Sequence, residues 1–426
     1  MDSSIKRIVG RRIWDSRGRP TVEVDVQLSG GMWGRGMAPA GASRGSHEAI
    51  DLRDGEGRHG GFDVQNALRG IREEIAPALI GLDARDQEAV DATLIALDGT
   101  PNKARLGGNA TIATSMAVLH AAAAAERLPL WRYLAGDAPV RLPLPEIQIF
   151  GGGAHAGRRI DIQDCMVMPL GADSFDEALC MVADVYRAAG ELMASLGRRA
   201  GVADEGGWWP AFSSNEEPLE LLARAIERAG YRHDQVAISL DIAASEFGRD
   251  GCYRLAVEDR EFATAEWIDV LRGWIGRYPI VSVEDPVAED DGDGMRAFTQ
   301  AVGDRVQVIG DDFLVTNAER VGAAAARGQC NAVLIKPNQA GTISEARRTM
   351  ETARALGWGT IVSARSGETE DTTITHLAVG WNAGQLKVGS FARSERMAKW
   401  NEALRIEEQL GRSARFAGRA ALPGSA

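Results

Sequence analysis

The chain has 426 residues, of which 45% are hydrophobic and 25% are charged, which predicts a globular protein with two domains, one of them as large as a βα barrel. The formal net charge of −12 disfavours a nucleic-acid-binding surface. No apolar run has transmembrane length and the N-terminus lacks a signal-peptide centre, so we predict a cytoplasmic protein without membrane contact. The four cysteines are scattered and form no CxxC pair, which favours reduced thiols.

Residues 1–135 are predicted to form a separate α+β domain. Residues 21–28 (TVEVDVQL) alternate apolar and polar side chains, which predicts a half-buried strand. Residues 34–46 are rich in Gly, Ala and Ser, a composition that predicts a mobile loop, with a linker as the alternative. The nearly apolar residues 110–126 predict a buried helix.

Residues 136–426 carry the pattern of a repeated βα unit. Six short apolar runs each lead to a charged residue, namely Asp241, Glu284, Asp311, Lys336, Arg365 and Lys387. Such runs suit strands buried on both faces, and the charges lie 22 to 43 residues apart, enough for a strand, a helix and two loops. Because the C-terminal strand ends of a βα barrel open onto one face, we expect these six side chains to converge at one mouth.

Helix signals fall where this repeat requires helices. Thr264 is available as the N-cap of one helix. Thr342 and Glu345 form a capping box before another helix, which Gly357 ends. The fold class predicted from these patterns is an α/β barrel preceded by an α+β domain.

Asp241, Glu284 and Asp311 form the strongest candidate site. Hard divalent cations such as Mg²⁺ prefer carboxylate oxygens, and three acids from successive strand ends can supply them. The alternative is that each acid caps the helix after its strand. Three such acids in succession, followed by Lys336, favour a metal site.

Three cations are expected at the same mouth. Lys336 could abstract a proton, because nearby metal cations favour its neutral form; the alternative is a counter-ion for Asp311 or Glu284. Lys387 and Arg365 could clamp an anionic substrate, Arg365 through two parallel hydrogen bonds to a carboxylate or phosphate. Structural ion pairs are the alternative for both.

Three further candidates lie outside the repeat. Glu205 lies in the Gly-flanked segment ADEGGWWP, where it could approach a ligand or serve only as a turn residue. His155 lies in a Gly-rich loop, where a lone histidine usually has no special role. Asp164 ends the run IDIQD and is predicted to be another strand-end acid.

With these residues in place, the chain resembles the enolase (phosphopyruvate hydratase) family along nearly its whole length. The matching segments are DSRGRPTVE (15–23), GASRGSHEA (41–49), GGAHAG (152–157), DEGG (204–207), LDIAASEF (240–247), SVEDP (282–286), GDDFLVTN (310–317), LIKPNQAGT (334–342), RSGETEDTTI (365–374) and ARSERMAKWNEALRIEEQLG (392–411). The resemblance implies an N-terminal α+β capping domain, a βα barrel with an irregular start, and commonly a homodimer.

The resemblance also implies a site that binds two Mg²⁺ ions and a small phosphorylated carboxylate. The first ion would be held by Asp241, Glu284 and Asp311. Ser43, in the predicted mobile loop, would help to close the site over the second ion. The two cations would stabilise the enediolate that forms when a proton leaves C2 of the substrate.

The resemblance further implies roles for the remaining groups. Lys336 would take the C2 proton, and Lys387 would hold the substrate carboxylate. Glu205 would protonate the departing 3-hydroxyl, with His155 and Asp164 nearby.

At the substrate, Arg365 and Ser366 would bind the phosphate. Gln163 is also predicted to bind the substrate. Two departures from the family pattern fall here. The family segment SHRSGE reads SARSGE, so Ala364 replaces a histidine, and Arg44 adds a cation to the mobile loop. Together they suggest a larger or more anionic ligand than 2-phosphoglycerate.

A third departure is at Asp164, where the family segment QEF reads QDC, which withdraws the carboxylate by one methylene, roughly 1.5 Å. Three readings follow from the sequence. The first is the family enzyme acting on 2-phosphoglycerate or a similar phosphorylated or phosphonylated acid. The second is a specialised paralogue of phosphonate biosynthesis similar to carboxyphosphonoenolpyruvate synthase. The third is a non-catalytic binding protein, which the complete set of acids and lysines disfavours.

Overall fold

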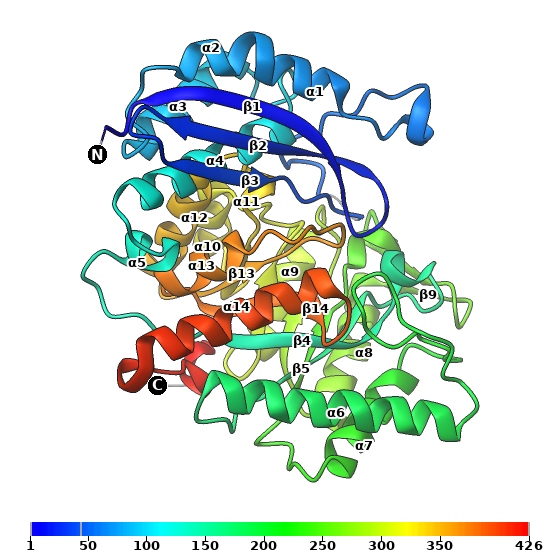
Figure 1. The fold of residues 1–426 in the computed structure, drawn as a ribbon. Coiled ribbons are helices and arrows are strands. Elements are labelled where there is room, and N and C mark those ends of the chain that lie inside the picture. The colour runs from blue at the N-terminus through cyan, green and yellow to red at the C-terminus, as the bar shows by residue number, and fades with distance from the viewer. Residues whose placement is uncertain (1, 43–44, 425–426) are drawn as a thin grey trace.

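The computed structural model describes residues 2–42 and 45–424, which form an N-terminal part stacked on a barrel (Figure 1). The predicted boundary near residue 135 falls between helix α5 (Leu130–Ala135) and strand β4 (Leu144–Gly151). Among the described residues, no helix is both long and apolar enough to cross a membrane.

The N-terminal part is a three-stranded antiparallel sheet in the order β1-β2-β3, packed against helices. The strands are β1 (Ile5–Trp14), β2 (Pro20–Leu28) and β3 (Trp33–Met37). The helices besides α5 are α1 (Gln65–Gly70), α2 (Ala76–Leu79), α3 (Gln87–Asp98) and α4 (Gly108–Ala125). As predicted, α4 is almost entirely buried.

The prediction of a half-buried strand at residues 21–28 is wrong, because β2 is buried on both faces. It is the central strand of the sheet, and its acidic side chains Glu23 and Asp25 are covered by arginines from the two flanking strands. Arg35 Nε lies 2.7 Å from Asp25 Oδ1, and Arg11 contacts both carboxylates. Ion pairing therefore allows polar side chains to alternate on a strand that is buried throughout.

The segment predicted as a loop at residues 34–46 begins as strand β3. Its glycines are needed for packing, because a Cβ at Gly34 would lie 2.1 Å from the carbonyl oxygen of Ala117 in α4. A Cβ at Gly36 would lie 2.4 Å from the carbonyl oxygen of Ala113. The glycines thus let the sheet approach α4 closely. Of the described residues of this segment, only those after Met37 lie outside the strand.

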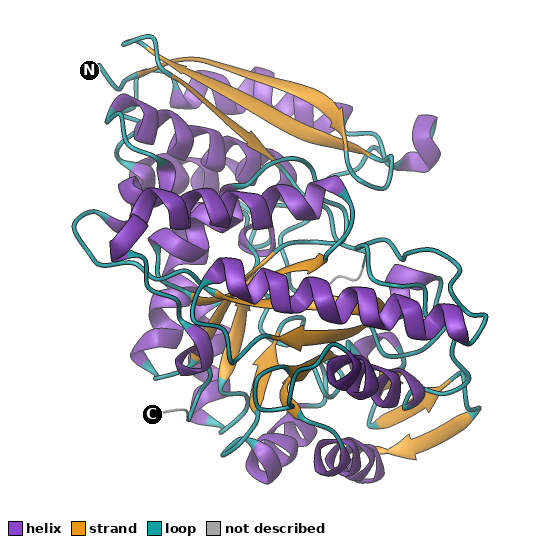
Figure 2. Cartoon of the chain, turned by 60° about the horizontal axis from the view of Figure 1, so that its bottom comes forward, coloured by secondary structure: helices purple, strands orange, loops and turns teal. Residues whose placement is uncertain are grey.

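The barrel is closed and has the strand order β10-β11-β12-β13-β14-β4-β5-β6. Figure 2 shows its strands in orange with helices around them. Its strands after β4 are β5 (Asp164–Met168), β6 (Ala237–Asp241), β10 (Ile280–Glu284), β11 (Gln307–Gly310), β12 (Ala332–Ile335), β13 (Gly359–Ser363) and β14 (Gly384–Ser390). Strand β5 runs antiparallel to both neighbours, whereas the other pairs are parallel. This confirms a βα barrel with an irregular start beneath an α+β cap.

Helices cover the outside of the barrel, and a small sheet of three short strands lies beside it. The helices are α6 (Phe175–Ser195), α7 (Glu217–Arg228), α8 (Thr264–Arg277), α9 (Gly292–Val302), α10 (Ala318–Ala326), α11 (Pro337–Ala340), α12 (Ile343–Ala355), α13 (Thr373–Gly380) and α14 (Ser394–Leu410). The small sheet consists of β7 (Gly248–Arg249), β8 (Cys252–Leu255) and β9 (Arg260–Ala263).

One predicted helix cap is confirmed and another is wrong. Thr342 caps α12, and its hydroxyl accepts the backbone N–H of Glu345. Thr264 is instead the first residue of α8, whose N-cap is Ala263. The Thr264 hydroxyl is committed elsewhere, since it donates to Asp291 Oδ2 at 2.6 Å.

The N-terminal part is joined to the barrel through the buried carboxylate of Asp91 on α3. Its Oδ1 accepts the hydroxyl of Ser115 on α4 at 2.6 Å and the side-chain amide of Gln87 at 3.1 Å. Its Oδ2 accepts both the backbone N–H and the hydroxyl of Ser344 on α12, at 2.9 and 2.7 Å. One carboxylate therefore connects two helices of the cap to a helix of the barrel.

All four cysteines have free thiols, as predicted. Cys165 and Cys330 are buried, whereas Cys180 and Cys252 are exposed.

Candidate active site

The barrel mouth and the cap together line one small cavity. Gly41 and Ala42 line it from the cap, and the strand ends and loops of the barrel supply the rest. Ten of the predicted site residues line this cavity, namely His155, Gln163, Asp164, Glu205, Asp241, Lys336, Ala364, Arg365, Ser366 and Lys387. Glu284 and Asp311 are buried and contact lysines of this lining. Ser43 and Arg44 lie outside the described residues.

Five of the six repeat charges lie where the barrel pattern predicts them, at or just after a strand end, namely Asp241, Glu284, Asp311, Lys336 and Arg365. Lys387 also lines the cavity, but it does not end its strand as predicted, since it lies inside β14. That strand continues to Ser390 because it pairs with β4 beyond a register shift between Lys387 and Gly389.

The prediction that Asp164 ends a strand is also wrong, because it is the first residue of β5. Since β5 runs antiparallel to its neighbours, its N-terminal end lies beside the C-terminal end of β6, and Asp164 pairs in register with Asp241. The reversal of one strand therefore brings this acid to the same mouth.

The two lysines lie among the predicted metal ligands. Lys387 Nζ is 2.8 Å from Asp241 Oδ2 and 2.7 Å from Glu284 Oε2. Lys336 Nζ forms an ion pair with Asp311. Burial disfavours both charges of that pair, but mutual attraction prevails, so the pKa of Asp311 lies below and that of Lys336 above its ordinary value.

Glu284 is the least compensated of these acids. Burial, and next the charge of Asp241, raise its pKa well above the ordinary value. Its Oε1 is buried and has no hydrogen-bond partner among the described residues, although buried polar atoms are normally satisfied. An unsatisfied carboxylate oxygen beside further carboxylates fits a hard divalent cation, for which all the donors here are suitable.

Among the described residues, close-set acids also occur at Asp285, Asp311 and Asp312, whose carboxylate oxygens lie within 4.8 Å of one another. Asp285 accepts the backbone N–H groups of Asp311 and Asp312 at 2.9 and 2.7 Å. It thereby fixes the turn that carries Asp311. The prediction missed Asp285 and Asp312, although each directly follows a predicted metal ligand in the sequence.

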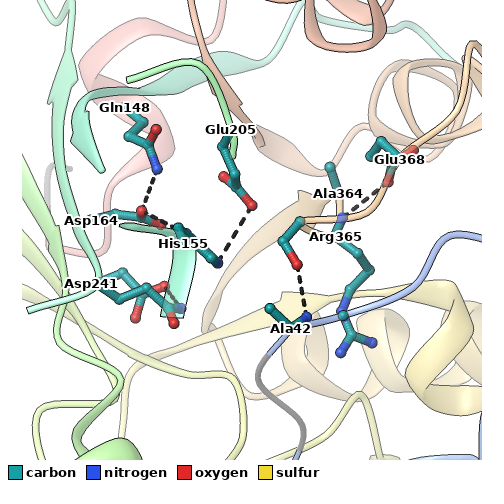
Figure 3. Close-up of polar contacts among 12 residues, drawn as sticks. Ala42, Gln148, His155, Asp164, Glu205, Asp241, Ala364, Arg365 and Glu368 are labelled. Carbon is teal, nitrogen blue, oxygen red and sulfur yellow. Dashed lines mark hydrogen bonds and ion pairs between the residues drawn. The ribbon is translucent and has the colours of Figure 1, made fainter. Parts of the chain in front are cut away.

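His155 lies between two carboxylates on the opposite wall (Figure 3). Its Nδ1 is 3.2 Å from Asp164 Oδ1, and its Nε2 is 3.7 Å from Glu205 Oε1. Burial alone would lower the pKa of His155, but Glu205 and Asp164 outweigh it and raise that pKa to about 9. The imidazolium in turn contributes to holding the pKa of Asp164 at about 2 despite burial. The lone histidine is therefore part of a charged triad.

Arg365 and Ser366 form the wall nearest the cap. The Arg365 guanidinium pairs with Glu48 of the cap at 3.1 Å, and both side chains are buried. The Ser366 hydroxyl accepts the backbone N–H of Ala42 at 2.7 Å. Glu48 was missed by the sequence reasoning. Its side chain shows that the cap orients a cation of the barrel.

These features define a capped βα-barrel enzyme whose mouth gathers carboxylates, two lysines and an arginine around one small cavity. Residues 139–423 match the family model described as "Enolase, C-terminal TIM barrel domain", and residues 5–134 match "Enolase, N-terminal domain". The chain is 51% identical over 416 residues to "Enolase 1" of Desulfitobacterium hafniense (strain Y51), covering 97% of this chain and 95% of that protein. The chain belongs to the enolase family.

Proposed function

We propose that this protein is an enolase that dehydrates 2-phosphoglycerate to phosphoenolpyruvate. The observation that carries the proposal is that Lys336 and Glu205, the proposed base and acid, line one cavity together with the cations Lys387 and Arg365. Family membership and the 51% identity to "Enolase 1" support it.

We propose that Asp241, Glu284 and Asp311 hold one Mg²⁺ and that Ser43 contributes to a second. The unsatisfied oxygen of Glu284 supports the first assignment. When bound, the ions would supply the positive charge that stabilises a dianionic enediolate. Membership of the family supports magnesium as the metal.

Lys336 is the proposed base. It takes the proton from C2 as a neutral amine. Its ammonium group, which pairs with Asp311, must therefore first lose a proton. The electron pair left at C2 is delocalised into the substrate carboxylate. Lys387 lies beside the same acids and would face that carboxylate.

Glu205 is the proposed acid. It must first take up a proton, because it faces His155 as a carboxylate, and it then gives that proton to the 3-hydroxyl as the C3–O bond breaks, so water leaves and the C2–C3 double bond forms. His155 contacts Glu205 and Asp164 and holds both carboxylates on this wall. The proton taken at C2 and the proton given at C3 thus belong to different residues.

Arg365 and Ser366 are proposed to bind the phosphate, with Gln163 completing the substrate contacts. Ala364 leaves the adjacent wall without a side chain larger than methyl. Arg44 is proposed to add positive charge from the cap loop.

The comparisons give no support to a paralogue of phosphonate biosynthesis, so the altered residues are attributed to variation within the family. A homodimer in the cytoplasm remains a prediction that rests on family membership. Light scattering after size-exclusion chromatography measures the oligomeric state.

The test is phosphoenolpyruvate formation from 2-phosphoglycerate by purified protein with Mg²⁺. We expect turnover that a chelator abolishes and that Lys336→Ala lowers by at least about 10³-fold. Lys6→Ala, at an exposed position of β1, is the matched control and should turn over normally. Absence of turnover in the wild type with Mg²⁺ bound would overturn the proposal and favour a non-catalytic binding protein.

A further inference from the structure

Gln148 on β4 is completely buried and lies behind the cavity wall. Its side-chain amide touches two functional segments at once. Nε2 donates to Asp164 Oδ1 (Figure 3). Oε1 accepts the backbone N–H of Gly207 at 2.9 Å. Gly207 follows the proposed acid Glu205 by two residues.

The orientation of this amide follows from the chemistry of its partners. The ionised carboxylate of Asp164 can only accept a hydrogen bond, and the N–H of Gly207 can only donate one. Turning the amide over would set donor against donor and acceptor against acceptor. Gln148 therefore has one satisfied orientation, which ties the two segments together.

The space around this amide is equally restrictive. A Cβ at Gly207 would lie 2.4 Å from Gln148 Oε1, and a Cβ at Gly151 would lie 3.1 Å from it. The long side chain is accommodated because both positions are glycine. The turn that carries Glu205 is anchored on its other side, where the Glu205 carbonyl accepts the N–H of Ser390 at 3.0 Å.

We propose that Gln148 is a positioning residue that sets the distance between Asp164 and the turn carrying Glu205. The proposal rests on the proposed function, in which Glu205 delivers the proton to the leaving hydroxyl. His155 spans the same two acids from the cavity side, so Gln148 provides a second connection from behind. Together the two connections hold the acid wall rigid against the substrate.

The combined length of two side chains carries this connection. Gln148 reaches across from β4, and the shorter Asp164 reaches back from β5. Moving one methylene from position 148 to position 164 conserves the total reach, whereas removing or adding one at either position alone changes it by roughly 1.5 Å. The proposal therefore predicts that the two positions compensate each other.

The experiment is a double-mutant cycle of steady-state kinetics with Gln148→Asn, Asp164→Glu and both together. We expect each single variant to lose about 10- to 100-fold in kcat with KM changed less than about threefold, because a shift of about 1 Å misplaces the acid. The double variant restores the reach between the two side chains but not the bond to Gly207, so it should lose clearly less kcat than the product of the two single losses. Gln385→Asn is the matched control, because Gln385 is equally buried but near the start of β14, where it pairs with Gln307.

A double variant that is no better than the product of the two single losses would overturn the proposal, as would a loss confined to KM. Wild-type protein without turnover would overturn the proposed function but would not test the role of Gln148. The connection itself is then measured by amide hydrogen exchange. Gln148→Asn should speed exchange of the Gly207 N–H while Gln385→Asn does not, and unchanged exchange at Gly207 would overturn the connection.

Discussion

Asp91→Ala should weaken the joint between cap and barrel. The substitution leaves four donors without their charged acceptor, from Gln87, Ser115 and Ser344. The hydroxyls can turn to other acceptors, but the backbone N–H of Ser344 cannot. Burial raises the pKa of Asp91, so the free energy that these hydrogen bonds contribute is partly offset by the cost of burying the carboxylate. We therefore expect a net loss of about 3–4 kcal/mol.

Thermal unfolding followed by circular dichroism at one fixed scan rate measures this loss. For a chain of 426 residues, such a loss lowers Tm by about 4 °C. Asp86→Ala is the control, because Asp86 is an exposed N-cap of the same helix and its loss costs about 1 kcal/mol. Equal effects of the two substitutions would refute the view that Asp91 joins the two parts.

Three further changes test the site and the packing of the cap. Glu48→Gln should raise KM for the phosphorylated substrate about tenfold by releasing Arg365, and unchanged KM would contradict this orienting role. Because the pKa of His155 is raised from 6.5 to about 9, its charge stabilises the fold fully below pH 6.5, and stability on the order of 3 kcal/mol should disappear as pH rises through 9, measured by urea unfolding against His155→Gln. Gly34→Ala should cost about 2–3 kcal/mol by separating β3 from α4, whereas Gly276→Ala, where a Cβ meets nothing within 4 Å, should not destabilise.

Much of the fold could be predicted because buried strands and apolar helices leave local patterns. The runs ending at Asp241 and Glu284 contain no charged residue before these acids and match β6 and β10 at their last residues. The direction of β5 was not predictable in this way, since a short apolar run reads the same in a parallel and an antiparallel strand. The error at Asp164 has another cause, because residues 160–163, which lead to it, are irregular and the strand begins only at Asp164.

The charged residues of the site were predictable for a different reason. The C-terminal strand ends of a βα barrel open onto one face, whatever the length of the chain that connects them. The partners that hold these residues were not. Gln148 lies inside an apolar strand, and Glu48 lies 317 residues from Arg365, so neither connection has a local signal. Such residues are found only when the folded chain shows what they touch.

The reversed strand β5 also carries a built-in reporter of barrel opening. Cys165 follows Asp164, and because successive side chains of a strand point to opposite faces, its thiol lies in the apolar layer outside the barrel while Asp164 lines the cavity. The thiol is fully buried, and burial raises its pKa, so a thiol-specific reagent reaches it only when this part of the barrel opens. With Cys180, Cys252 and Cys330 replaced, the labelling rate of Cys165 would measure how often the strand that carries Asp164 opens, and bound substrate should slow that rate.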